Sequence, residues 1–290
     1  LEARLNEAIV GQSALNARLV LALLADGHLL VEGAPGLAKT TAIKTLSGLI
    51  EGDFRRIQFT PDLLPADLTG TEVFRPQSGA FEFQPGPMFH NLLLADEVNR
   101  APAKVQSALL EAMGERQVTI GLHSYPLPAL FMVMATQNPI EQEGTYPLPE
   151  AQLDRFLLYV RVGFPDKDAE RAILEIARNQ ARRGAGGPAE DVSDMVSEAT
   201  ILEAREAVLD LHMAESIEQY IVELIAATRD ASPYDEEAAR WIRFGASPRA
   251  SIGLDRCARA HAWLRGQDFV SPADVQEVAF DVLRHRLILN

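Results

Sequence analysis

Residues 33–40, Gly-Ala-Pro-Gly-Leu-Ala-Lys-Thr, combine small residues, a lysine and a hydroxyl at the spacing of a phosphate-binding loop. An apolar stretch at 28–32 precedes them, and a helical pattern follows. In such a loop, backbone N–H groups and the positive end of the helix dipole face the phosphates. The lysine adds positive charge, and the hydroxyl of Thr40 reaches Mg²⁺. Ala38 stands where the usual pattern has glycine, so a plain strand-to-helix turn with Lys39 in solvent is the alternative.

Two carboxylates, Asp96 and Glu97, end the apolar stretch 92–96. In a phosphate-loop protein, an acid at a strand end can hold Mg²⁺ directly or through its water. The next acid can act as a general base on the attacking water. Asp96 is then the metal ligand and Glu97 the base. A solvated carboxylate pair at a strand end is the alternative, but the loop and the acids together favour nucleotide hydrolysis.

Two further polar residues, each beside a predicted strand, could take part in nucleotide hydrolysis. Asn138 comes one residue after the apolar stretch 130–136 and could bond the γ-phosphate or position water; otherwise it is a turn residue before proline. Arg155 precedes the last predicted strand and could reach the γ-phosphate on a neighbouring subunit. An ion pair with Asp154 or Glu150 within the chain is the alternative for Arg155.

Composition limits the class of protein. The 290 residues are 47% hydrophobic, which suffices for one large or two moderate domains. The single cysteine, Cys257, excludes an internal disulfide and fits a reducing compartment, so we expect a cytoplasmic protein. No apolar run approaches the ~20 residues that span a bilayer, so we expect no membrane association. A net charge of −14 makes nucleic acid an unlikely partner, and the six histidines lack metal-ligand spacing.

The order of elements predicts an α/β fold with a parallel five-stranded sheet between helices. The predicted strands are 29–32, 56–60, 92–96, 130–136 and 157–162. Inserted hairpins are predicted at about 60–87 and 117–127. Beyond residue 165 the pattern turns helical, with apolar residues at helical spacing and Ser-Pro helix starts at 247–248 and 271–272. We therefore predict a nucleotide domain at 1–165 and an all-helical domain at 166–290.

At this point the chain resembles the MoxR family of AAA+ ATPases. The matching stretches are 9–12, 33–40, 96–102, 106–113 and 136–156, of which 143–156 is the most diagnostic. The resemblance covers nearly the whole chain and is least distinctive in the helical tail. In this family alanine is common at the position of Ala38, so the departure from the general loop pattern becomes a family trait.

The resemblance implies a full set of site residues. Gln12 and its neighbours lie near the adenine, Asp96 and Glu97 form the Walker B pair, and Asn138 is sensor 1. Arg155 is the finger that acts on a neighbouring subunit, and Arg249 is sensor 2, reaching from the helical lid to the γ-phosphate of ATP bound between the two domains. Thr40 and Asp96 serve Mg²⁺. The expected ATP-binding residues are Val10, Gly11, Gln12, Gly33, Ala34, Pro35, Gly36, Leu37, Ala38, Lys39, Thr40 and Thr41. Arg100 and Arg116 also lie in or beside matching stretches, with no role assigned.

By the same resemblance the chain forms an oligomeric ring, with six subunits the expected number, toward whose pore the two hairpins project. It acts as a chaperone-like remodelling, metal-insertion or maturation factor. Its partners are a client protein and a separate protein with a von Willebrand factor A domain. Two other functions stay open: a nucleic-acid-translocating motor, for which Arg75 is the one basic hairpin residue that could line a pore, and a magnesium-chelatase-like subunit.

Overall fold

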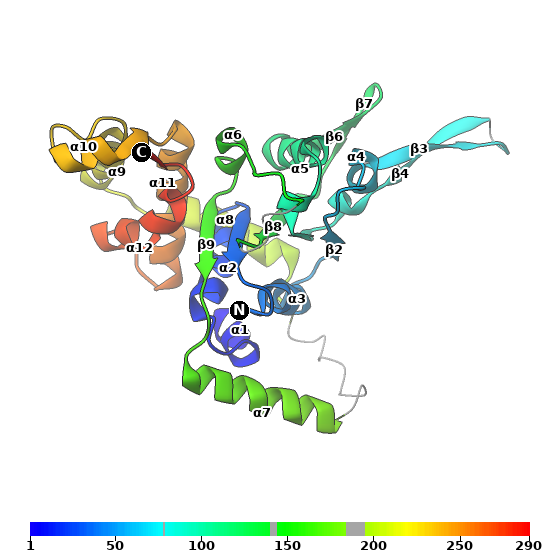
Figure 1. Ribbon diagram of the computed structural model, residues 1–290, viewed down its shortest axis with the longest axis horizontal. Coiled ribbons are helices and arrows are strands. Elements are labelled where there is room, and N and C mark those ends of the chain that lie inside the picture. The colour runs from blue at the N-terminus through cyan, green and yellow to red at the C-terminus, as the bar shows by residue number, and fades with distance from the viewer. Residues whose placement is uncertain (78, 140–143, 184–194) are drawn as a thin grey trace.

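The computed structural model describes residues 1–77, 79–139, 144–183 and 195–290. Parts of the first predicted hairpin and of the 143–156 stretch therefore lie outside the described residues. The centre of the molecule is a parallel sheet in the order β2-β5-β8-β1-β9, which confirms the predicted five strands (Figure 1). The strands are β1 (Leu29–Gly33), β2 (Phe54–Gln58), β5 (Leu92–Asp96), β8 (Met132–Gln137) and β9 (Leu158–Val162).

Alternation along the strands divides the core between the two faces of the sheet. Leu29 and Val31 of β1 point to one face, and Leu30 points to the other; all three are fully buried. The first face is covered by α1 (Glu2–Ala8), α2 (Ser13–Leu24) and α3 (Lys39–Leu49). The second is covered by α4 (Pro65–Thr69) and α5 (Ala103–Glu115). Burial on both faces explains why β1, β5, β8 and β9 read as nearly continuous apolar runs, whereas the edge strand β2 is mostly exposed.

The two predicted hairpins are present and project from the body (Figure 1). They are β3 (Gly70–Arg75) with β4 (Ala80–Pro85), and β6 (Gln117–Ile120) with β7 (His123–Pro126). The rings of Phe83 in β4 and Tyr125 in β7 stack with centroids 4.0 Å apart. This contact couples the hairpins, so they form one projecting unit. Short elements flank them: η1 (Pro87–Phe89), η2 (Val98–Arg100) and α6 (Glu150–Leu153).

The remainder of the chain is helical, as predicted, with one departure. Its helices are α7 (Lys167–Arg183), α8 (Glu198–Asp210), α9 (Glu215–Arg229), α10 (Glu236–Trp241), α11 (Pro248–Leu264) and α12 (Pro272–Leu283). A short antiparallel pair, β10 (Ile242–Phe244) and β11 (Ile288–Leu289), makes the expectation of an all-helical domain wrong in this detail. Two- and three-residue strands are too short to give an alternating pattern in the sequence.

The first core continues from the sheet into this helical part. Buried side chains of α8, α11 and α12 pack in the same cluster as those of α2. Arg205 of α8 donates from Nε to the Leu23 carbonyl oxygen (2.9 Å), and Arg18 of α2 pairs with Asp281 of α12 (2.7 Å). The helical part is thus docked on the sheet, and a domain boundary at residue 165 stays a prediction. Among the described residues no helix is long and apolar enough to cross a bilayer.

Two buried histidines should make stability depend on pH. Burial, with a smaller effect of Arg116, lowers the pKa of His28 to about 3. Its Nδ1 accepts the Val133 N–H (3.1 Å), which requires the neutral ring. Burial, followed by Arg286, lowers the pKa of His285 to about 3 as well. Both rings are therefore neutral in the folded state.

The unfolded chain binds these two protons at pH values between about 6.5 and 3, whereas the folded chain does not. Stability contributed by the neutral rings is thus present above pH 6.5 and is lost as the pH falls. Each histidine should cost about 2 kcal/mol of unfolding free energy between pH 6.5 and 5. Urea unfolding at both pH values measures this change. His28→Gln should have a smaller pH slope than the parent chain; an equal slope would contradict the assignment to His28.

Candidate functional site

The loop between β1 and α3 has the backbone of a phosphate cradle. Gly36 and Ala38 have φ angles of 82° and 57°, in the left-handed region. Gly36 adopts this region freely, whereas Ala38 does so with its Cβ present, at the position where the general loop pattern has glycine. A Cβ on Gly33 would lie 2.9 Å from the Val162 carbonyl oxygen, so glycine there permits β1 to run close to β9. The residue types of the loop therefore match its observed conformation.

Lys39 begins α3 and turns back over the loop. Its Nζ donates to the carbonyl oxygens of Gly33 and Ala34, the latter at 3.2 Å. Burial lowers the pKa of Lys39, while the carboxylates of nearby acids act in the opposite direction. The ammonium group of Lys39 is thus held inside the loop, where phosphate oxygens would accept hydrogen bonds from it.

Asp96 ends β5, and its carboxylate is fixed on both oxygens. The Thr136 hydroxyl of the neighbouring strand β8 donates to Oδ1 (2.6 Å) and accepts the Glu97 N–H (2.9 Å). Arg56 of β2 donates from Nη2 to Oδ2 (2.6 Å). The side chain of Asp96 is nine-tenths buried, and that of Arg56 is half exposed. Oδ2 of Asp96 thus faces the guanidinium of Arg56 on the edge strand β2.

Glu97 follows directly, with a left-handed φ of 57° that turns its side chain out of the strand. Its Oε2 accepts from Gln58 Nε2 (2.7 Å) and lies 3.2 Å from Arg100 Nε. Gln58 and Arg56 are two residues apart on β2, so they share one face beside β5. Arg100, left without a role by the sequence, therefore pairs with the predicted general base.

Sequence reasoning missed Arg56, Gln58 and Thr136 as partners of the two acids. Thr136 lies in a recognised stretch, but β2 attracted attention only as an apolar run. The signal for Arg56 and Gln58 exists only once β2 is known to pair with β5, in register Gln58 opposite Asp96. Strand order is set by packing over the whole domain, so the sequence pattern did not reveal it.

Two other predicted segments lie at the same edge of the sheet. Asn138 follows β8, which lies between β1 and β5, and it is 6% exposed. Gln12 donates from Nε2 to the Gly163 carbonyl oxygen (3.2 Å), just beyond β9. Gly11 has a φ of 79°, and a Cβ there would approach the Ala169 Cβ to 2.8 Å. The carboxyl edge of the sheet thus brings Asn138 and the 10–12 segment to the strand ends that carry the loop and the acid pair.

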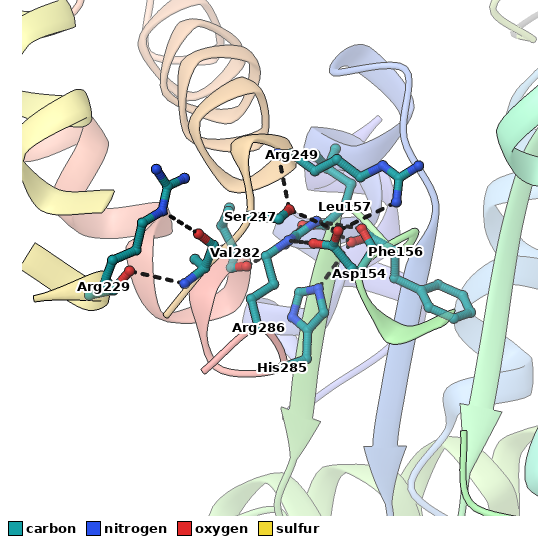
Figure 2. A network of polar contacts seen from close by, with 11 residues as sticks. Asp154, Phe156, Leu157, Arg229, Ser247, Arg249, Val282, His285 and Arg286 are labelled. Carbon is teal, nitrogen blue, oxygen red and sulfur yellow. Dashed lines mark hydrogen bonds and ion pairs between the residues drawn. The ribbon is translucent and has the colours of Figure 1, made fainter. Parts of the chain in front are cut away.

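Arg155 lies at the opposite edge, where β9 begins. Its Nη1 donates to the Leu110 carbonyl oxygen (2.8 Å). The ion pair with Asp154 considered from the sequence is not what forms: Asp154 accepts from Arg286 Nε (2.8 Å) and the Ser247 hydroxyl (2.8 Å), as Figure 2 shows. The guanidinium of Arg155 is therefore held by a neutral acceptor.

Arg249 lies in the same place as Arg155 and away from the phosphate loop. Its Nη1 is 3.4 Å from Asp154 Oδ2 (Figure 2), and Ser247 caps the helix start beside it. The expectation that Arg249 reaches a phosphate bound by the loop of its own chain is thus not met. The reason is the docking of α11 against the strand that Arg155 precedes, through Arg286, which donates to the Asp154 and Phe156 carbonyl oxygens (3.2 and 2.7 Å).

The cleft between the sheet and the helical part is consequently an arginine cleft, with a volume of about 360 Å³. Its charged lining residues are Asp26, Arg116, Asp154, Arg155, Arg249, Arg256 and Arg286. Arg116, the other arginine without an assigned role, pairs with Asp26 (2.6 Å), as does Arg205 (2.6 Å). No residue of the loop lines this cleft. The predicted position of ATP between the two domains of one chain is therefore not supported.

Comparisons with known proteins agree with this architecture. Residues 28–158 match the family model described as ATPase family associated with various cellular activities (AAA), and residues 235–290 match that of the AAA lid domain. The chain is 48% identical to Chaperone MoxR1 of Mycobacterium tuberculosis, covering 97% of this chain and 73% of that protein. It is 32% identical to Protein MoxR of Paracoccus denitrificans, covering 100% and 88%.

A solved structure gives the same result. The crystal structure of a protein from Cytophaga hutchinsonii, described as a candidate ATPase, superposes with a TM-score of 0.89 at 47% identity. The match covers 99% of this chain and 86% of that one. Fold, site and sequence together place the molecule: the chain belongs to the MoxR family of AAA+ ATPases.

Proposed function

We propose that the chain is a subunit of a Mg²⁺-dependent ATPase whose active site is completed by a second copy. The separation of the two groups of residues carries this proposal. Lys39, Glu97 and Asn138 follow carboxyl ends of parallel strands, whereas Arg155 and Arg249 lie where β9 begins. One chain cannot direct both groups at one phosphate, but two adjacent copies can.

Each residue then has a role that fits its surroundings. Lys39 and the N–H groups of residues 33–41 bind the phosphates. Glu97 takes a proton from the attacking water, which Asn138 orients. Arg155 and Arg249 of the next copy stabilise the charge that develops on the γ-phosphate. The sequence placed Arg249 on the same chain's nucleotide, and we now assign it to the neighbour's.

The residues proposed for Mg²⁺ suit that ion. Thr40 offers a hydroxyl in the first turn of α3, and Asp96 offers an oxygen that already attracts the guanidinium of Arg56 at 2.6 Å. Hard oxygen donors, few in number, are what Mg²⁺ takes from proteins when phosphates supply the remainder. When bound, the ion neutralises charge on the β- and γ-phosphate oxygens. Arg56 must then leave Oδ2 or share it.

Assembly follows from the same geometry. A face carrying Arg155 that meets a different face carrying the loop is a head-to-tail contact, and repeated rotation closes it into a ring. We propose a ring, with six subunits as the expected number. We further propose that the assembly acts in the cytoplasm as a chaperone-like factor for client proteins, including metal insertion or maturation, alongside a separate von Willebrand factor A partner.

The projecting hairpins favour a polypeptide client over nucleic acid. Phe74 and Phe81 pack together with centroids 5.3 Å apart and are 50% and 70% exposed. Leu122, at the turn between β6 and β7, is 99% exposed. Arg75, the basic residue considered for a nucleic-acid motor, pairs with Glu82 at 2.7 Å. An apolar tip with its arginine neutralised suits unfolded protein and offers little to a phosphate backbone.

Mixing two inactive variants tests the shared site. Lys39→Ala removes the phosphate cation and Arg155→Ala removes the finger, so each alone should hydrolyse ATP poorly. In a random equal mixture about one quarter of the sites combine an intact loop with an intact finger from the next copy. Steady-state phosphate release should therefore recover to about one quarter of the parent rate. If the mixture stays as inactive as its components, the two groups do not act across chains.

A further inference from the structure

Helix α7 runs along the lower edge of the molecule in Figure 1, below α1. The Asp166 carboxylate caps its start, accepting the N–H groups of Asp168 (3.1 Å) and Ala169 (2.8 Å). Its described side chains are all half-buried or exposed. A helix that packed fully on its own chain would bury one stripe of side chains, whereas here Ala169, Ala172 and Ile176 are only half-buried and the other described residues are exposed.

The sequence of α7 nevertheless contains such a stripe. Residues spaced three or four apart share a helix face, and here these residues are apolar. The stripe consists of Ala169, Ala172, Ile173, Ile176 and Ala177. At 100° per residue, Glu170 borders one side of the stripe, and Asp168 and Glu175 border the other. Leu174 lies on the polar side of the helix. Alanines beside isoleucines form an apolar surface that a partner helix can approach closely.

The helix starts beside the proposed nucleotide site. Only four residues separate β9 from Lys167, and Ala169 lies against Gly11, next to the Gln12 that bonds Gly163. A neighbouring copy that brings Arg155 to this loop must therefore pass along the first turns of α7. The stripe is continuous with the surface that the second copy already has to cover.

The face that carries Arg155 and Arg249 has a complementary surface. Ile252 of α11 lines the arginine cleft and is 54% exposed. Arg249, Ile252 and Arg256 are three and four residues apart, so they share one face of α11. Arg256 lies two turns beyond Arg249, about 10 Å along the axis. One copy thus presents an exposed isoleucine between arginines along its cleft, and the other presents an apolar stripe between acids.

We propose that the apolar stripe of α7 is the docking surface for α11 of the next copy, with Ile252 against the stripe and Arg256 beside the acids of α7. This inference rests on the proposed two-copy active site and names the helices that hold it together. In this arrangement Arg249 reaches the phosphates while the following turns of α11 lie on α7. Docking therefore fixes the position of the arginines that complete the site.

A pair of adjacent substitutions tests the stripe. Ile173→Asp places a charge in the apolar stripe, and Leu174→Asp places the same charge 100° further around the helix, on its polar side. Both side chains are well exposed, at 41% and 56%, so both variants should fold with parent-like thermal unfolding. Sedimentation velocity with Mg²⁺ and ATPγS should show Ile173→Asp assembling only at concentrations at least about tenfold higher than the parent chain. Leu174→Asp should assemble as the parent does. Equal assembly of all three chains would overturn the proposal.

A contact between specified residues tests the partner surface. One tagged chain carries Ile173→Cys, and a second, differently tagged chain carries Ile252→Cys. A short bismaleimide should join the two kinds of chain to each other, because the native Cys257 is fully buried and does not react. Ile173→Cys with Leu209→Cys, another exposed lid position (56%), is the matched control. Equal cross-linking in both mixtures, or linkage of two cysteines within one doubly substituted chain, would overturn the proposal.

The shared active site and the docking surface can fail separately. If the Lys39→Ala and Arg155→Ala chains complement each other but Ile173→Asp assembles like the parent, the two-copy site stands and α7 does not hold it. If Ile173→Asp weakens assembly and the cysteines cross-link while no complementation occurs, α7 holds the copies together and the arginines do not act across chains. Binding of a fluorescent ATP analogue by Ile173→Asp should be unchanged, because the loop itself is intact.

Discussion

Replacing Glu97 with Gln is expected to slow ATP hydrolysis about a thousandfold while ATP still binds. A carboxylate that takes a proton from water contributes a factor of about 10² to 10⁴, and an amide cannot take that proton. The position of the side chain should survive, because an amide oxygen can still accept from Gln58 Nε2, which is 2.7 Å from the carboxylate in the parent chain. Single-turnover hydrolysis measures the chemical step, and a fluorescent ATP analogue measures binding.

Glu203→Gln is the matched control, because it removes the same charge from an exposed position on α8. It should hydrolyse ATP at the parent rate. Single-turnover hydrolysis by Glu97→Gln within a few-fold of the parent would assign the proton transfer to another group. The Glu97→Gln variant also tests for a client protein. A ring held in the ATP state should retain its client on affinity capture. Recovery of this chain alone would speak against a stable client complex.

The fold was largely predictable because four of its five central strands are buried on both faces, β2 at the edge being the exception. Continuous apolar runs such as 92–96 mark central strands, and hairpins showed themselves through alternating residues around a glycine. The β10–β11 pair was missed because strands of two and three residues carry no period. The position of α7 could not be predicted either, since its amphipathic pattern shows that a face will be covered and not by which chain.

The candidate site likewise contains residues whose positions the sequence predicts and residues whose positions depend on packing. Residues that follow a strand directly, such as Asp96 and Asn138, must lie at the carboxyl edge of a parallel sheet, so the sequence alone placed them. Arg249 is different, because it belongs to a helix whose position depends on how the helical part docks. That docking runs through Arg286 and Asp154, 132 residues apart, and no local pattern encodes it. The position of Arg249 therefore depends on packing that the sequence does not show, and its role stays a prediction.

Replacing Arg155 with Ala is expected to reduce ATP hydrolysis by a factor of about 10³ to 10⁵, the range of an arginine that stabilises phosphoryl-transfer charge. Binding of ATP should persist, because Arg155 is at the opposite edge of the sheet from the loop that holds the nucleotide. Steady-state phosphate release and binding of a fluorescent ATP analogue separate the two effects. Folding should be spared, since within the described part of the chain the Arg155 side chain gives up only its hydrogen bond to the Leu110 carbonyl oxygen.

Two further variants, Arg249→Ala and Arg243→Ala, distinguish a specific role of Arg155 from the general loss of a positive charge. Arg243 is exposed on β10 and should be dispensable. Arg249 is proposed for the same phosphate, so its loss should also reduce the rate without weakening nucleotide binding to the same chain. Loss of an arginine that served only its own chain's nucleotide would instead weaken ATP binding by the isolated subunit. If Arg155→Ala weakens ATP binding by unassembled chains as much as it slows turnover, the finger acts within its own chain and the two-copy site is wrong.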